Sequence, residues 1–118
     1  QVGAACHTGN RTCFFNNIVK KEYVEKNPLT VLESVYAVIV DRMKNPKEDS
    51  YTNAVMEKGI DEILKKLGHE CTEIILAAKN PDSDDLKFEI SDFMYHCMIL
   101  MAQKNITWAE IAGELAQR

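Results

Sequence analysis

Apolar residues recur every three or four positions over most of the chain, which is the spacing of one face of an α-helix. The first such stretch follows Pro28, a residue suited to a first helical turn, with Asn27 as its cap. The spacing predicts a first helix of about four turns. Its apolar positions are Leu29, Leu32, Val35, Tyr36, Ile39, Val40 and Met43.

Two breaks divide the next part of the chain. The segment NPKEDS ends the first helix, and SYTNAVMEKG predicts a short helix capped at Ser50 or Thr52 and ended near Gly59. The most regular stripe then runs from residue 60 to residue 78, where the breaker NPDSD follows. This stripe predicts a helix whose core-facing residues are Ile60, Ile63, Leu64, Leu67, Cys71, Ile74, Ile75 and Ala78.

A long helix is expected after this breaker, capped by Asp82 or Ser83 and running from about residue 84 to residue 104. Its expected buried side consists of Leu86, Ile90, Phe93, Cys97, Leu100 and Met101. Tyr95, Met98 and Ile99 lie on another side of the same helix. Because one chain of this size offers little to cover a second apolar side, we expect a homodimer to cover it.

The spacing Thr107-Trp-Ala-Glu110 is that of a capping box and opens a last short helix. Its apolar positions are Trp108, Ile111, Ala112 and Leu115. No segment shows convincing strand periodicity. The pattern therefore predicts an all-α helical bundle, completed by dimerisation, over residues 28–118, preceded by a non-helical segment over residues 1–27.

The net charge of −4, from 18 acidic and 14 basic side chains, argues against nucleic acid or a membrane as partner. No apolar run approaches the roughly 20 residues that span a bilayer, and the first residues lack a signal-peptide pattern. We therefore expect a cytoplasmic protein.

Cys71 and Cys97 lie among apolar residues of helical stripes, where a cysteine is usually a free thiol that packs as a small apolar side chain. The abrupt start at Gln1 indicates a piece of a longer polypeptide.

Two pairs of acidic residues mark the consecutive long helices. Glu70 and Glu73 lie beside one apolar stripe, and Glu89 and Asp92 have the same spacing on the next helix, with His96 one turn beyond. Antiparallel packing would bring these carboxylates around one volume, where a hard cation such as Mg²⁺ or Mn²⁺ would relieve their repulsion. The alternative is four solvated surface acids. A ferritin-like di-iron site requires Glu-x-x-His, which neither pair supplies.

The runs EKGIDEILKKLGHECTEIILAAKN and EISDFMYHCMILMAQKNITWAEI resemble phosphoribosyl-ATP pyrophosphohydrolase, of the MazG-like all-α nucleotide pyrophosphatase superfamily. The likeness extends from about residue 29 to residue 118. That superfamily is marked by Glu-Glu-x-x-Glu followed by Glu-x-x-Asp, and SYT, AAKN and DFMYH are typical of its phosphoribosyl-ATP branch. The resemblance implies that Mg²⁺ is bound by Glu70, Glu73, Glu89 and Asp92.

The implied reaction is hydrolysis of phosphoribosyl-ATP to phosphoribosyl-AMP and pyrophosphate, in histidine biosynthesis. Glu70 or Glu73 is the candidate general base that orients the attacking water. Lys66 and His96 are candidate phosphate contacts because they adjoin the acidic faces, and Lys79 because it lies in AAKN. Two other functions remain open, namely a MazG-like enzyme for another nucleoside triphosphate and a non-catalytic helical dimer module.

One position departs from the superfamily motif, since His69 stands where the first Glu is expected. On a helical wheel His69 points away from the core, toward a second ion, a water or a dimer partner. An exposed, replaceable histidine is the alternative interpretation. The substitution leaves room for reduced activity or altered metal use.

The first residues, QVGAACHTGNRTCFF, resemble the C-terminal zinc-ligand segment of phosphoribosyl-AMP cyclohydrolase. In that family Cys6 and Cys13 would bind Zn²⁺ together with a third cysteine, which neither Cys71 nor Cys97 is placed to supply. The Asp-x-Asp-x-Asp magnesium motif of the cyclohydrolase is also absent. The resemblance therefore implies an inactive cyclohydrolase remnant and linker over residues 1–27, with Zn²⁺ only in an intact cyclohydrolase domain, and the pyrophosphohydrolase over residues 28–118.

Overall fold

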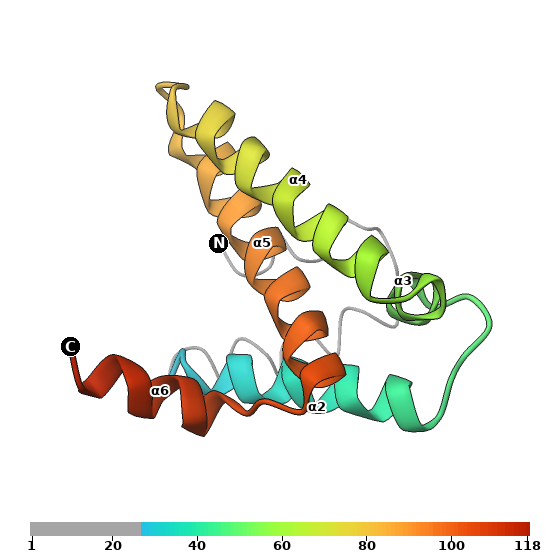
Figure 1. Ribbon diagram of the computed structural model, residues 1–118. Helices are drawn as coiled ribbons and strands as arrows, with labels where there is room; N and C mark the ends of the chain where they lie inside the picture. Colours follow the sequence, from blue (N-terminus) through green and yellow to red (C-terminus); the bar gives the residue numbers. More distant parts are fainter. Residues whose placement is uncertain (1–26) are drawn as a thin grey trace. The chain divides into compact units, whose positions relative to one another are not determined.

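The structure, a computed structural model, describes residues 27–118. These residues contain helices and no strand, which confirms the all-α class predicted from the sequence. The non-helical structure predicted for residues 1–27, and the motif with Cys6 and Cys13, lie outside the described residues, except for Asn27. The described helices are α2 (Thr30–Lys44), α3 (Tyr51–Lys58), α4 (Ile60–Ala78), α5 (Ser83–Lys104) and α6 (Trp108–Ala116), as labelled in Figure 1.

The chain divides into two compact units, Gln1–Val35 and Tyr36–Arg118, and the boundary falls within α2. In the first unit the Asn27 side chain accepts a hydrogen bond from the Leu29 backbone N–H, as a cap does. The regular helix nevertheless begins at Thr30 and not at Pro28 as expected, because Pro28 and Leu29 form a turn. The second unit carries all the acidic residues of interest.

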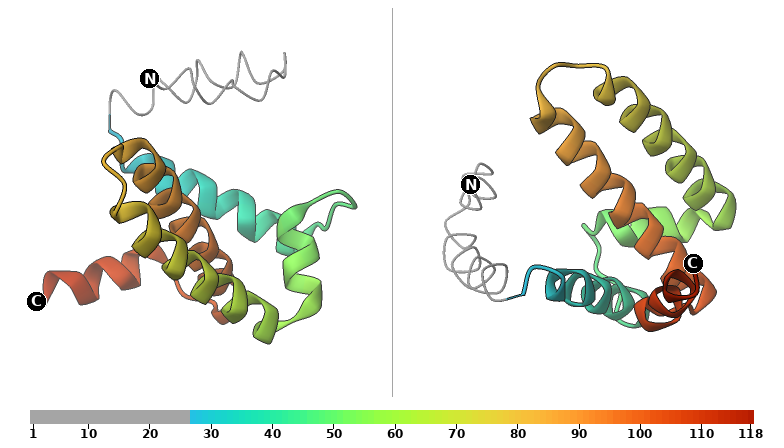
Figure 2. Two further views of the ribbon diagram at one scale, coloured as in Figure 1. Left: turned by 90° about the horizontal axis from the view of Figure 1, so that it is seen from above. Right: turned by 90° about the vertical axis from the view of Figure 1, so that its left-hand side faces the viewer.

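The helices α4 and α5 form an antiparallel pair that lies side by side in Figures 1 and 2. Both helices begin where the sequence signals predict. Gly59, with φ of 96°, joins α3 to α4 in a conformation that side chains disfavour, and the Asp82 side chain caps α5 by accepting the Asp84 N–H. At its other end α5 stops at Asn105, which adopts the left-handed conformation.

The short helix α3 packs against both α4 and α5. Ser50 caps it by accepting a hydrogen bond from the Asn53 N–H, so Ser50 and not Thr52 is the cap. Thr52 and Val55 are buried on its inner face. The buried apolar residues of the described chain are Ile39, Val55, Ile63, Ala77, Met98, Ile99, Met101 and Ala102.

The sides of α5 are covered differently from the prediction. Met98 and Ile99, expected to face outward and to need a second subunit, are 3% and 0% exposed within one chain. The expectation was wrong because α3 covers α5 in addition to α4, and Tyr36 in α2 donates a hydrogen bond to the Ile106 carbonyl just beyond α5. Tyr95 is half-buried and bonds to α3 through Thr52.

Part of the stripe predicted to be buried on α4 is instead exposed. Leu64 is 47% exposed and Ile75 is 60% exposed, and Cys71 and Ala78 are exposed as well. On α5 the same holds for Ile90, which is 42% exposed. One antiparallel partner covers only one side of a broad helical stripe. The apolar flank of α4 is therefore left uncovered in a single chain.

The last helix, α6, has the predicted capping box. The Thr107 side chain accepts the Glu110 N–H, and the Glu110 carboxylate accepts the Thr107 N–H in return. No residue of α6 is buried, and Leu115 is largely exposed. Among the described residues, no helix has both the length and the apolar composition needed to cross a bilayer.

Candidate active site

The antiparallel pairing of α4 and α5 brings the two acidic motifs together. Glu70 interacts directly with Asp92, and Glu73 is close enough to Glu89 to repel it. Moving three residues forward on α4, from Glu70 to Glu73, matches moving three residues back on α5, from Asp92 to Glu89. Both pairs therefore fit a single register of an antiparallel helical hairpin. The four carboxylates thus lie on one side of the hairpin, where the sequence predicted their convergence.

The tightest part of this site is formed by Glu70, Asp92 and His96. One potential ligand atom from each lies within 4.8 Å of the others. Burial raises the pKa of Glu70 above its ordinary value, and Asp92 raises it further through a hydrogen bond and like charge, while His96 acts in the opposite direction. Without a cation, Glu70 in the folded chain therefore keeps its proton to a higher pH than an ordinary glutamate does.

Glu89 forms the second part of the site, one turn before Asp92 on α5. Desolvation raises its pKa, and the like charges of Glu73, Asp92 and Asp85 raise it further. Repulsion among carboxylates is thus spread over both helices. A divalent cation bound among oxygen ligands would stabilise the ionised form of each.

His96 is buried, with 4% of its surface exposed, and both its ring nitrogens have protein partners. Its Nδ1 lies 2.8 Å from the Asp92 backbone carbonyl, which can only accept a hydrogen bond, so Nδ1 carries a proton. In the neutral ring Nε2 then accepts a hydrogen bond from the Tyr51 hydroxyl at 2.8 Å. The Nδ1 atom also lies 3.5 Å from a carboxylate oxygen of Asp92.

Tyr51 is a site residue that our sequence analysis did not assign. Burial raises the pKa of its hydroxyl, and the nearby carboxylates of Asp92 and Glu70 add to the rise. The adjacent Thr52 bonds to the hydroxyl of Tyr95. Two residues of the SYT segment therefore contact two residues of the DFMYH segment. The sequence analysis noted both segments as typical of the phosphoribosyl-ATP branch, but only the packing of α3 on α5 shows that they are in contact.

The other predicted site residues lie further out. Lys66, half-buried on α4, has an ion pair with Glu62 at 3.9 Å. Lys79 is exposed and ends α4 as its C-cap. His69 is exposed, as the helical wheel predicted, and its Nε2 lies 3.9 Å from a carboxylate oxygen of Glu73. His69 is thus linked to one of the acids even though it faces solvent.

Comparison with known proteins places most of the chain in one family. The pattern of the family described as phosphoribosyl-ATP pyrophosphohydrolase matches residues 32–118. A phosphoribosyl-ATP pyrophosphatase of Clostridium novyi is 51% identical over 90 residues, which are 76% of this chain and 82% of that protein. One of Bacillus cereus is 47% identical over 93 residues, 79% of this chain and 84% of that protein.

A histidine biosynthesis bifunctional protein HisIE of Caldanaerobacter subterraneus subsp. tengcongensis is 45% identical over 116 residues, which are 98% of this chain and 55% of that protein. This chain covers between 53 and 59% of the length of four such bifunctional relatives. The family pattern includes every helix from α3 to α6, and both acidic motifs. The chain belongs to the phosphoribosyl-ATP pyrophosphohydrolase family.

Proposed function

We propose that the second unit hydrolyses phosphoribosyl-ATP to phosphoribosyl-AMP and pyrophosphate, the second step of histidine biosynthesis. The observation that carries the proposal is the convergence of Glu70 with Asp92 and of Glu73 with Glu89 on one side of the α4–α5 pair. The names of the relatives that match most of the same region supply the substrate.

Mg²⁺ fits this group of residues. The donors are carboxylate oxygens, which hard divalent cations prefer. Like charges add to the effect of desolvation in raising the pKa values of Glu70 and Glu89, and a cation would offset that repulsion. We assign Glu70, Glu73, Glu89 and Asp92 as the residues that would hold the ion. When bound, the ion supplies neutralisation of phosphate charge and a lowered pKa for water.

The side chains around the acids have distinct proposed roles. Glu70 or Glu73 orients the attacking water and takes its proton. Lys66 and Lys79 contact phosphate oxygens. His96 was expected from the sequence to contact phosphate, but both its ring nitrogens bond within the protein. We therefore assign it a different role, which is to hold the backbone and carboxylate of Asp92 in place.

The decisive test is pyrophosphate release from phosphoribosyl-ATP by the purified chain, with Mg²⁺ and with a chelator. We expect release only with Mg²⁺, and its loss in Glu73→Gln and Asp92→Asn with unchanged helical circular dichroism. Retained turnover in both variants would contradict the site assignment. Preference for another nucleoside triphosphate in a substrate panel would favour the general MazG-like enzyme, and no release from any would favour the non-catalytic module.

The domain layout is also part of the proposal. We assign residues 28–118 to the pyrophosphohydrolase and residues 1–27 to the end of a cyclohydrolase domain and its linker, with Cys6 and Cys13 as zinc ligands of that domain when intact. The match to the bifunctional relative covers 98% of the chain, whereas the match to the Clostridium novyi protein covers 76%. The additional matched residues support a joined polypeptide.

We further propose that the chain forms a homodimer through the uncovered flank of α4. Leu64, Cys71 and Ile75 are spaced seven and four residues apart and so share one face of α4. Cys71 lies close enough to Cys97 to raise the pKa of the Cys97 thiol, together with the larger effect of burial. Ile90 precedes Cys97 by two helical turns, so the apolar surface continues onto α5. The cytoplasmic location expected from the sequence remains a prediction.

A further inference from the structure

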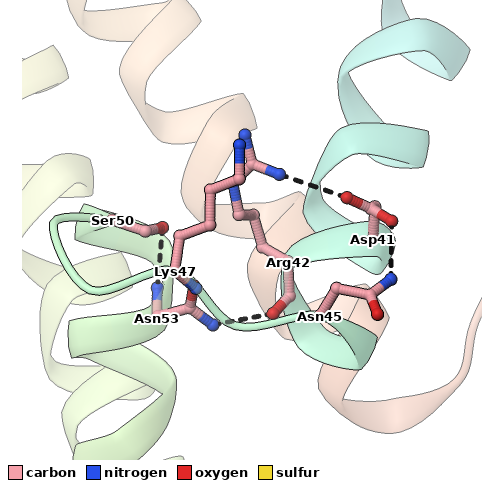
Figure 3. A network of polar contacts seen from close by, with 6 residues as sticks. All are labelled: Asp41, Arg42, Asn45, Lys47, Ser50 and Asn53. Carbon is pink, nitrogen blue, oxygen red and sulfur yellow. Dashed lines mark hydrogen bonds and ion pairs between the residues drawn. The ribbon is translucent and has the colours of Figure 1, made fainter.

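A second polar region lies where α2 leads into α3, outside the carboxylate cluster. It surrounds a pocket of about 370 Å³. Among the described residues, its walls are formed by Arg42, Lys47, Glu48, Asp49 and Ser50. Figure 3 shows the side chains of Arg42 and Lys47 extending to the same side of the loop.

A single residue, Asn53, fixes the backbone around this pocket. Its side-chain oxygen accepts the Lys47 N–H at 2.8 Å, and its side-chain nitrogen donates to the Arg42 carbonyl at 2.8 Å. Its own backbone N–H donates to Ser50. Asn53 therefore ties three residues of the pocket wall to the first turn of α3 (Figure 3), so both basic side chains start from fixed backbone positions.

The two basic groups are weakly neutralised. Arg42 pairs with Asp41, its neighbour in sequence, at 3.1 Å, but the Asp41 side chain is 55% exposed and such pairs contribute little. No carboxylate of the described residues forms an ion pair with the Lys47 ammonium group. Glu48 and Asp49 also belong to the wall and oppose an anion there. A bound anion would therefore be held by direct hydrogen bonds to the Arg42 guanidinium and the Lys47 ammonium groups, which must outweigh the repulsion from these two acids.

The pocket is next to the proposed active site along the chain. Ser50, in its wall, precedes Tyr51, whose hydroxyl bonds to His96 beside Asp92. The α-carbons of consecutive residues are about 3.8 Å apart. The pocket wall is thus one residue away from a side chain that contacts the carboxylate cluster, and a substrate that reached both would pass Tyr51.

Phosphoribosyl-ATP has phosphate at both ends, a triphosphate on one ribose and a monophosphate on the other, with the purine between them. Carboxylates that hold a cation recognise the triphosphate end, which ATP shares. Discrimination from ATP requires contacts to the second ribose phosphate. We propose that Arg42 and Lys47 bind this phosphate monoester and so determine the specificity of the reaction, an inference that rests on the proposed function.

The kinetic test uses Arg42→Gln and Lys47→Gln, which remove charge and leave the backbone bonds of Asn53 intact. We expect each to raise KM for phosphoribosyl-ATP roughly ten-fold, a loss of about 1.4 kcal/mol, with a smaller change in kcat. Glu48→Gln should lower KM. Lys44→Gln is the matched control, because Lys44 is an exposed lysine of α2 outside the pocket wall, and its KM should not change.

A binding test separates this inference from the proposed function. We expect ribose 5-phosphate, but not ribose, to shift the amide NMR signals of residues 47–51 in the full chain. The same titration should give smaller shifts in Arg42→Gln, in Lys47→Gln and in the double variant. This titration needs no turnover, so it decides the pocket even if phosphoribosyl-ATP is not hydrolysed. Unchanged KM in both variants, an equal rise in Lys44→Gln, or undiminished ribose 5-phosphate shifts in the variants would overturn the inference.

Discussion

Folding disfavours the ionised form of Glu70, which is the form that would bind a metal ion. Its pKa in the folded chain is raised by desolvation, and further by Asp92 and Glu89. An unfolded chain has a glutamate pKa of about 4.3. Between that value and the raised one, the folded state binds more protons than the unfolded state. Rising pH through this window therefore lowers the stability of the metal-free protein.

This argument predicts how Glu70→Gln changes the pH dependence. In the presence of a chelator, the variant should be more stable than the unaltered chain at pH 7, and the two should become alike below about pH 4. Urea denaturation at both pH values measures the difference. Glu114→Gln, on the exposed surface of α6, serves as control and should leave the curve unchanged. A smaller slope will remain in Glu70→Gln, since Glu89 also has a raised pKa.

Helix α3 illustrates how a short element is held in place by a few polar contacts. It has eight residues, too few to be stable alone, and two of its hydrogen bonds reach α5. One joins Tyr51 to His96, and the other joins Thr52 to Tyr95. The first ends beside the acidic cluster and the second lies outside it. Removing one bond at a time can therefore distinguish an effect on the stability of the fold from an effect on the acidic site.

Removing each hydroxyl should separate these roles. Tyr51→Phe leaves the buried Nε2 of His96 without its donor, and Tyr95→Phe removes the bond to Thr52. Each should lower the free energy of unfolding by about 1 kcal/mol. Only Tyr51→Phe should also reduce the turnover of phosphoribosyl-ATP, because it alone frees the ring that holds Asp92. Equal turnover in the two variants, measured at a temperature where both are folded, would argue against this role for Tyr51.

Helix α6 has a reciprocal cap and no fully buried residue. The reciprocal bonds of Thr107 and Glu110 fix its first turn. Thr107→Ala should destabilise the helix by about 1 kcal/mol. Hydrogen exchange should show faster amide exchange in α6 with little change in α4. Thr72→Ala, which removes an exposed hydroxyl within α4, is the control and should not affect α6.

At the level of elements, the sequence predicted where helices begin and end better than which residues they bury. Ser50, Asp82 and Thr107 cap helices as expected because a cap depends on local backbone geometry. Burial depends on which neighbour covers each side of a helix. The spacing that marked Ile75 as apolar does not distinguish a side facing the same chain from a side left open. The same limit explains the error at Ile99.

For the whole molecule, the convergence of the acidic residues could be predicted from the sequence because it depends on one antiparallel pairing. Two motifs on consecutive helices with a short connection have few ways to pack, and Glu70 meets Asp92 in the expected register. The contribution of Tyr51 depends on α3 returning to both long helices, which no local spacing encodes. The pocket of Arg42 and Lys47 likewise arises from a loop folded around Asn53.

Association of two chains follows from the apolar surface that remains uncovered. Ile75→Asp places a charge within the exposed stripe shared with Leu64 and should convert a dimer to the monomer of 13.4 kDa, as measured by light scattering at micromolar concentration. Leu76→Asp is the matched control, since Leu76 is 56% exposed but points about 100° away on the same helix. It should leave the dimer intact. Ile99→Asp should unfold the chain instead, because its side chain is fully buried. A monomer mass for the unaltered chain at high concentration would show that the stripe on α4 is not an interface between copies.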